Sequence, residues 1–254
     1  MTTKVLQPEI DHDSGYFDVA GFAAATLASA PALAAVFDHT LLKPEATRDQ
    51  VVRLCEEAAS FRFACAMVNP AWVSLAHSVM VGSGVPVGVV VGFPLGANLA
   101  TTKREEAMAM IKLGAHELDM VMNIGALRSG DRQGVLNDII AVAEVAHGSG
   151  AIVKVILETP LLTLEEKILS CQLSLAAKAD FVKTATGFFG SATADDVSLM
   201  RGVVGDHAGV KASGGVRTAA NANAMLDAGA NRIGASASVA IVQELGAPEF
   251  KSRT

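Results

Sequence analysis

One lysine lies in the middle of a short apolar run, where a charged side chain is unexpected: Lys183 in "ADFVKTATGF", residues 179–188. Burying an ammonium group without a partner is unfavourable, so this side chain must pair with an anion, lose its proton or reach water. Three interpretations are open: a structural ion pair, a phosphate contact or a lysine nucleophile. A neutral lysine can attack a carbonyl and form a Schiff base, whose iminium withdraws electrons from a carbon–carbon bond that is broken or formed.

Charged residues share one face of four strand-like runs. Because successive side chains of a strand point to opposite faces, "ELDMV" separates Glu117 and Asp119 from its apolar residues. The same alternation separates Lys154, Lys183 and Lys211 from the apolar residues of their own runs. If the apolar faces pack against helices, the charged faces meet on the inside of the sheet. A set of mutually neutralising ion pairs is the alternative, but the agreement of four strands favours a polar reaction chamber.

Two of these lysines fall on consecutive predicted strands. Lys183 and Lys211 are therefore close enough for each to disfavour the charge of the other, which favours a neutral amine. A carboxylate such as Asp119 could carry protons in the same reaction. This chemistry needs no cofactor and no metal, and the sequence offers no cluster of His or Cys residues for one.

The runs alternate with helical patterns along the chain. Thr or Asp caps open several of the helical stretches, such as "TRDQVVRLCEEAAS", and glycine ends several of them. Eight successive βα units predict an α/β fold, a (β/α)8 TIM barrel, although an open doubly wound sheet is the alternative. No G-x-G-x-x-G follows an early strand, so a dinucleotide-binding fold has no support. The predicted strands lie within 36–42, 62–69, 85–94, 116–123, 151–159, 179–186, 209–215 and 231–238.

Length and composition fit one large domain. We expect residues 1–18 to be a poorly ordered lead-in and residues 19–254 to form a single barrel domain, with an extra Ala-rich N-terminal helix ending near Pro31. The net charge of −6 and the absence of a basic cluster argue against a nucleic-acid partner. No apolar run is long enough for a membrane span, and the polar N-terminus does not resemble a signal peptide. With three cysteines and no CxxC pair, the sequence predicts a cytoplasmic protein.

Glycines follow the last two predicted strands. Gly214 and Gly215 in "KASGGVRT" allow backbone N–H groups to approach an anion, and Ser236 in "RIGASAS" could add a hydroxyl. Loops after the seventh and eighth strands often hold phosphate in barrels of this kind. A Gly-Gly pair is more often only a turn, but this position in a barrel favours a phosphate site.

The ordered motifs resemble those of the deoxyribose-phosphate aldolase family. The similarity covers residues from about Val36 to Val239 and rests on "FDHTLLKPEAT", "VNPAWV", "VGFPLGAN", "ELDMVMNIGAL", "VKVILET", "FVKTATGF", "VKASGGVRT" and "RIGAS". The resemblance implies a (β/α)8 barrel and a class I, Schiff-base aldolase. Its reaction would be the reversible cleavage of 2-deoxy-D-ribose 5-phosphate to D-glyceraldehyde 3-phosphate and acetaldehyde.

The resemblance also implies roles for individual residues. Lys183 matches the Schiff-base lysine, Lys211 matches the second lysine that tunes it, and Asp119 matches the acid/base aspartate. The expected phosphate-binding residues are Gly187, Gly214, Gly215 and Ser236. The expected substrate-pocket residues are Asp38, Thr186 and Lys154. Apart from the resemblance, strand alternation in "IVKVILE" puts Glu158 on the same face as Lys154, which makes the two a candidate ion pair.

Four features depart from the family pattern. Ala185 stands where the family usually has serine, Ala237 where a second hydroxyl is common, and Met67 where cysteine is frequent. The only tyrosine is Tyr16, so the C-terminal sequence cannot supply the tyrosine that assists proton transfer in some members. That leaves proton transfer to Asp119, Lys211 and water, or to a different route.

Rival functions share parts of this site. Another lysine-dependent barrel aldolase or a transaldolase would keep Lys183 but need a larger donor pocket. A non-catalytic phosphosugar-binding barrel would keep the phosphate loops, with a Lys183 of ordinary pKa. An isomerase barrel would normally use a carboxylate base and would not need Lys183 together with Lys211.

We expect small phosphorylated sugars or aldehydes as substrates, and a homodimer or higher homo-oligomer.

Overall fold

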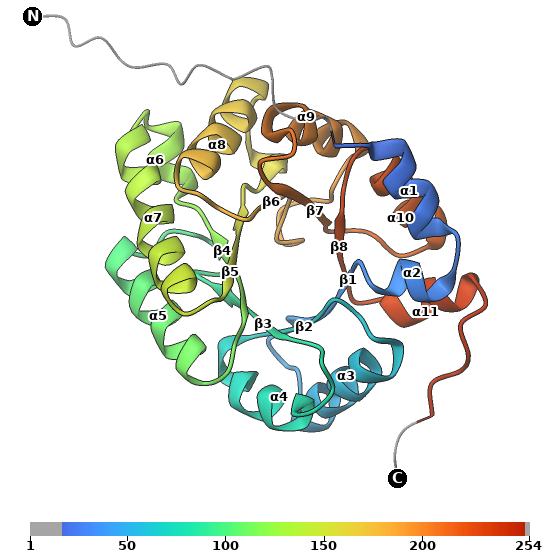
Figure 1. Cartoon of the computed structure of the whole chain (residues 1–254). Helices are drawn as coiled ribbons and strands as arrows, with labels where there is room; N and C mark the ends of the chain where they lie inside the picture. Colours follow the sequence, from blue (N-terminus) through green and yellow to red (C-terminus); the bar gives the residue numbers. More distant parts are fainter. Residues whose placement is uncertain (1–16, 252–254) are drawn as a thin grey trace, which may run out of the picture.

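Eight parallel strands form a closed barrel in the computed structural model, which describes residues 17–251 (Figure 1). Strands pair in sequence order, and β8 pairs with β1 to close the ring. Each strand falls within one of the eight predicted runs, so the predicted (β/α)8 barrel is confirmed. The strands are β1 (Phe37–Leu41), β2 (Cys65–Val68), β3 (Val87–Val91), β4 (Glu117–Val121), β5 (Ile152–Ile156), β6 (Phe181–Lys183), β7 (Gly209–Ser213) and β8 (Arg232–Ala235).

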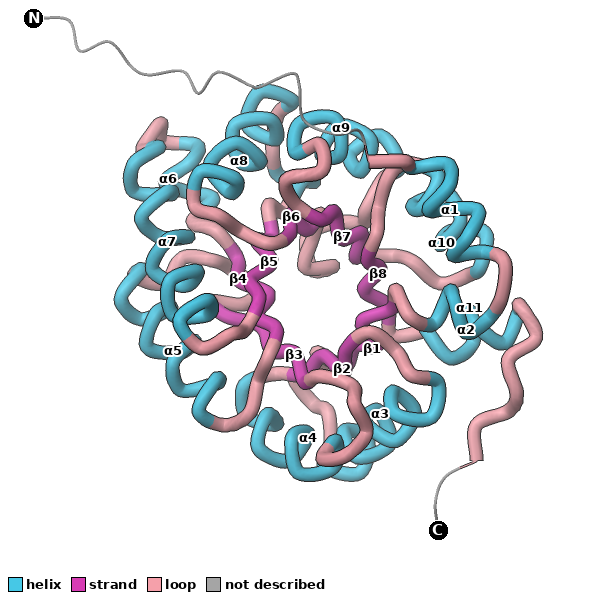
Figure 2. Tube along the Cα trace, in the orientation of Figure 1, coloured by secondary structure: helices cyan, strands magenta, loops and turns pink. Residues whose placement is uncertain are grey.

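Helices form the outer layer around this ring (Figure 2). Thr47 and Thr163 cap the helices that follow them, as the Thr-led patterns predicted, and each cap is a capping box. The helix that begins after Leu99 has no side-chain cap. Short 3-10 helices cover Pro70–Trp72 and Thr159–Leu161. The outer helices are α3 (Arg48–Phe61), α4 (Val73–Met80), α5 (Ala100–Lys112), α6 (Ile124–Arg128), α7 (Arg132–Gly148), α8 (Leu164–Ala176), α9 (Ala194–Val204), α10 (Ala219–Asp227) and α11 (Ser238–Glu244).

The segment before the barrel forms two helices, α1 (Val19–Leu27) and α2 (Ala30–Ala34), so the expected single helix ending near Pro31 is wrong. Pro31 lies in the first turn of α2, where its missing N–H is not needed, and the Ser29 side chain caps that turn. α1 contacts α10 and α2 contacts α11. The lead-in expected over 1–18 lies outside the described residues up to residue 16, and Asp18 accepts a hydrogen bond from Gly21 N–H at 2.9 Å.

The two faces of the strands have different surroundings. Outward-facing residues, such as Leu118, Val153 and Val182, pack with the helices in one large apolar core. Inside the barrel a small apolar cluster of Cys65, Met67 and Val90 occupies the side of β2 and β3. The remaining strands bring charged side chains into the interior. Among residues 17–251, no helix is long and apolar enough to cross a membrane.

Candidate active site

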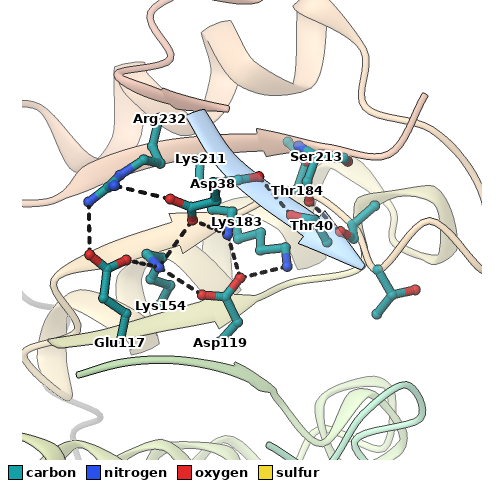
Figure 3. A network of polar contacts seen from close by, with 12 residues as sticks. Asp38, Thr40, Glu117, Asp119, Lys154, Lys183, Thr184, Lys211, Ser213 and Arg232 are labelled. Carbon is teal, nitrogen blue, oxygen red and sulfur yellow. Dashed lines mark hydrogen bonds and ion pairs between the residues drawn. The ribbon is translucent and has the colours of Figure 1, made fainter. Parts of the chain in front are cut away.

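Charged side chains from six strands meet inside the barrel (Figure 3). The strand register places Lys183 opposite Lys211 and Asp119 opposite Lys154. The inward orientation that side-chain alternation predicted is therefore the one found. We call this set the lysine–carboxylate cluster, and its members are Asp38, Glu117, Asp119, Lys154, Lys183, Lys211 and Arg232.

Asp119 on β4 contacts all three lysines of the cluster. Its Oδ2 accepts hydrogen bonds from Lys183 Nζ at 2.7 Å and Lys211 Nζ at 2.6 Å, and its Oδ1 accepts one from Lys154 Nζ at 3.0 Å. Burial alone would raise the pKa of Asp119, but the lysines outweigh burial and hold the pKa well below its ordinary value. Asp119 is therefore an ionised carboxylate at neutral pH.

Lys183 at the end of β6 is 3% exposed, and Asp119 is its ion-pair partner. Burial lowers the pKa of Lys183 to about 8, and the Lys211 and Lys154 cations lower it too, although Asp119 opposes them. At pH 7, a fall from 10.5 to about 8 increases the neutral fraction of this amine roughly 300-fold. Lys183 thus has the property that a lysine nucleophile needs.

The charge balance of the cluster singles out the same amine. Its four basic and three acidic groups would carry a net charge of +1 if all were ionised. Carboxylates raise the pKa of Lys154 well above its ordinary value despite burial, and basic neighbours lower the pKa of Asp38 to about 2. Loss of the Lys183 proton leaves the cluster neutral, which burial in a low-dielectric interior favours.

Asp38 and Lys154, both expected in the substrate pocket, are 0% exposed. Asp38 Oδ2 accepts a hydrogen bond from Lys211, and Lys154 Nζ lies 3.2 Å from Asp38 Oδ2 and 2.5 Å from Glu117 Oε2. The structure therefore places both residues in the buried interior of the barrel, as charged neighbours of Lys211 and Asp119.

The expected ion pair between Lys154 and Glu158 is wrong. Lys154 pairs with carboxylates deeper in the barrel, whereas the Glu158 carboxylate accepts hydrogen bonds from Thr186. The alternation that placed both on one face ends with β5 at Ile156, and Glu158 has a left-handed backbone with φ 59°. Its side chain consequently leaves the face that Lys154 occupies.

Arg232 is a member of the cluster that the sequence reasoning missed. Its Nη1 donates to Asp38 Oδ1 at 3.0 Å and its Nη2 to Glu117 Oε1 at 3.3 Å. Alternation in "RIGA" would have found it, because Arg232 shares a strand face with Gly234. A Cβ on Gly234 would lie 3.0 Å from Lys211 Cε, so glycine there leaves room for the second lysine.

Donor atoms of Asp38, Cys65 and Glu117 lie within 4.8 Å of one another, a spacing that a metal ion could use. However, Lys154 and Arg232 already bond to both carboxylates. Burial also raises the pKa of the Cys65 thiol well above its ordinary value, which disfavours the thiolate that a metal needs. The trio is therefore a poor fit to a metal.

The glycines expected to bind phosphate bring two loops together. Gly187, Gly214 and Gly215 have φ values of 89°, 96° and 81°, which favour glycine. A Cβ on Gly187 would lie 3.8 Å from Gly214 Cα, and one on Gly215 would lie 2.7 Å from Ser191 Oγ. Ser236 is exposed directly after β8, the neighbour of β7. Thr186 is half-buried at the start of the first loop.

Comparison with known proteins places this site in a family. Residues 32–244 match the family model described as DeoC/LacD family aldolase. A deoxyribose-phosphate aldolase of Bacillus mycoides is 54% identical over 211 residues, which cover 83% of this chain and 94% of that protein. One of Thermoanaerobacter sp. is 55% identical over 214 residues, or 84% and 96% of the two chains.

A solved structure agrees with these relatives. The deoxyribose phosphate aldolase of Aeropyrum pernix, described as having a unique tetrameric structure, is 34% identical with a TM-score of 0.83. The match covers 89% of this chain and 96% of that one. This chain belongs to the deoxyribose-phosphate aldolases of the DeoC/LacD aldolase family.

Proposed function

We propose that this protein is a class I aldolase that reversibly cleaves 2-deoxy-D-ribose 5-phosphate to D-glyceraldehyde 3-phosphate and acetaldehyde. Family membership supports the reaction. The observation that carries the mechanism is the buried Lys183, whose pKa is lowered to about 8 beside Asp119 and Lys211. The chemistry uses the lysine itself, so it requires no cofactor.

The reaction begins when neutral Lys183 attacks the C1 aldehyde of the open-chain sugar. Loss of water gives an iminium, which withdraws the electron pair of the C2–C3 bond while the C3 hydroxyl gives up its proton. D-Glyceraldehyde 3-phosphate leaves, and the remaining enamine takes a proton at C2. Hydrolysis of the resulting iminium releases acetaldehyde and restores Lys183.

Asp119 and Lys211 are assigned to proton transfer. Lys211 Nζ lies 2.6 Å from Asp119 Oδ2, so a proton can be shared between the two groups and with a substrate oxygen beside Lys183. The low pKa of Asp119 makes it a weak base on its own. We therefore assign Lys211 as its partner in proton exchange with the substrate. This pair is the proposed route for proton transfer.

Two further parts of the proposal concern the binding site of the substrate phosphate and the oligomeric state of the protein. We assign the substrate phosphate to the loops that carry Gly187, Gly214 and Gly215, with Ser236 as a hydroxyl donor, because these loops meet at left-handed glycines. We also propose that the chain forms a homo-oligomer, since the Aeropyrum pernix relative is tetrameric.

The rate of imine formation is expected to depend on pH in a defined direction. Only the neutral amine attacks, so kcat/KM should rise about tenfold per pH unit below the pKa of Lys183 and level off above about 8. A pH–rate profile of cleavage, with protein stability checked at each pH, measures this. A profile that continues to rise to pH 10 would contradict the lowered pKa.

Borohydride trapping with acetaldehyde tests the proposed function. We expect intact mass to show an ethyl adduct and peptide mapping to place it on Lys183. An adduct with a keto donor but none with acetaldehyde would favour another lysine-dependent aldolase or a transaldolase. No adduct with any carbonyl would favour a phosphosugar-binding barrel without catalysis.

A further inference from the structure

A buried carboxylate just beyond the C-terminal end of β5 has no part in the mechanism above. Glu158 is 0% exposed, and no basic side chain of residues 17–251 forms an ion pair with it. Its oxygens instead accept hydrogen bonds from the backbone N–H of Thr186, at 3.2 Å each, and from the Thr186 hydroxyl at 2.5 Å. Burial raises the pKa of Glu158, and the Lys183 cation opposes this without contacting it, so the direct partner of this buried acid is a threonine and not a cation.

The backbone conformation orients the Glu158 side chain toward Thr186. Leu157 N–H donates to Lys183 C=O and Thr159 N–H donates to Thr184 C=O, both at 2.9 Å, so the chain on either side of Glu158 is held against β6 and its extension. Between these bonds Glu158 takes a left-handed conformation, φ 59° and ψ 56°, that disfavours residues with a side chain. The strained turn places the carboxylate on Thr186, three residues beyond the nucleophile.

This contact fixes the hydrogen-bonding direction of the Thr186 hydroxyl. A threonine hydroxyl has one proton to donate and two lone pairs that accept. The proton goes to Glu158, and Phe188 N–H donates to the hydroxyl oxygen at 3.1 Å. One lone pair remains on a half-buried side chain, so a ligand at Thr186 must bring a donor.

We propose that Glu158 is a positioning residue for the sugar substrate: it holds Thr186 as a hydrogen-bond acceptor, so that the site selects substrates with a hydroxyl group at that point. The inference rests on the proposed function, because it specifies which hydrogen-bonding group the aldolase site presents to its substrate. A substrate lacking the hydroxyl would leave the acceptor unpaired, which is a strong source of discrimination.

The test compares two acceptor aldehydes in the synthetic direction, with acetaldehyde as donor. D-Glyceraldehyde 3-phosphate carries a hydroxyl next to its aldehyde, and 3-oxopropyl phosphate lacks it. We expect the ratio of their kcat/KM values to fall roughly tenfold in Glu158→Leu and in Thr186→Val, because leucine, unlike glutamine, leaves no oxygen to accept the Thr186 hydroxyl proton. The double variant should show no further fall, because both changes remove one interaction. Glu144→Leu, at an exposed position on α7, is the matched control.

The ethyl adduct on Lys183 separates this inference from the proposed function. Acetaldehyde has no hydroxyl, so trapping in Glu158→Leu should stay within about twofold of wild type if Lys183 is undisturbed. An unchanged aldehyde ratio in Thr186→Val, which keeps Glu158, would overturn the inference even if Glu158→Leu fails to fold. Additive effects in the double variant would also overturn it. A wild-type protein that forms no adduct would instead overturn the proposed function.

Discussion

Replacing Lys183 with alanine is expected to lower kcat/KM for 2-deoxy-D-ribose 5-phosphate cleavage by at least about 10⁴-fold and to abolish the ethyl adduct. Lys183 is the amine of the cluster whose pKa is lowered to about 8, whereas the pKa of Lys154 lies well above its ordinary value. Lys154 therefore cannot replace the missing nucleophile. Steady-state kinetics and borohydride trapping of the purified variant measure both effects.

The same variant should remain folded. Alanine removes one cation from a cluster with an excess of one, and Asp119 keeps its contacts with Lys154 and Lys211. We expect a melting temperature within about 5 °C of wild type. Lys112→Ala, at an exposed position on α5, should leave activity unchanged as the matched control. An adduct that persists on Lys211 in the alanine variant would contradict the assignment of the nucleophile.

The face on which Lys183 lies was predictable because strand alternation is a local property. A residue in a regular strand points inward or outward according to its position, so Lys154, Lys183 and Lys211 could be placed on one face from the sequence alone. Eight repeats in order then indicated that this face closes into a barrel interior.

The same reasoning failed where regular structure ends or where contacts span the barrel. Glu158 lies past the end of β5 in a left-handed turn, so alternation gave it a wrong partner. Pro31 lies in the first turn of a second helix, where a helix end was expected. Proline interrupts the interior of a helix, but it is tolerated in the first turn, so its position alone could not decide between the two. The bond between Asp38 and Lys211 joins residues 173 apart in sequence, and no local pattern contains such a pair.

The charge balance of the lysine–carboxylate cluster changes when the iminium forms. With Lys183 neutral, the four basic and three acidic groups balance, and formation of the iminium returns one positive charge to the interior. Asp119, which accepts hydrogen bonds from both Lys183 and Lys211, lies where that charge develops. A fixed carboxylate at this position stabilises the iminium without rearrangement of the site.

Asp119→Asn is accordingly expected to lower kcat by about 10²–10⁴-fold while imine formation with acetaldehyde persists. Asp119 raises the pKa of Lys183, so its loss should move that pKa below about 8 and keep the amine neutral at pH 7. The iminium then forms, but it lacks its counter-charge and the proton carrier. Borohydride trapping and turnover, measured on the same preparation, separate the two steps.

The Asp119→Asn variant should be less stable than wild type but should remain folded. Breaking a buried ion pair costs about 3–5 kcal/mol, which should lower the melting temperature. The fold should survive, because Lys154 retains Glu117 and Asp38, and Lys211 retains Asp38. Asp227→Asn, an exposed change on α10, controls for loss of a carboxylate elsewhere. If trapping and turnover fell by the same factor, Asp119 would serve only to hold Lys183 in place, and the proton-transfer role would pass to Lys211 and water.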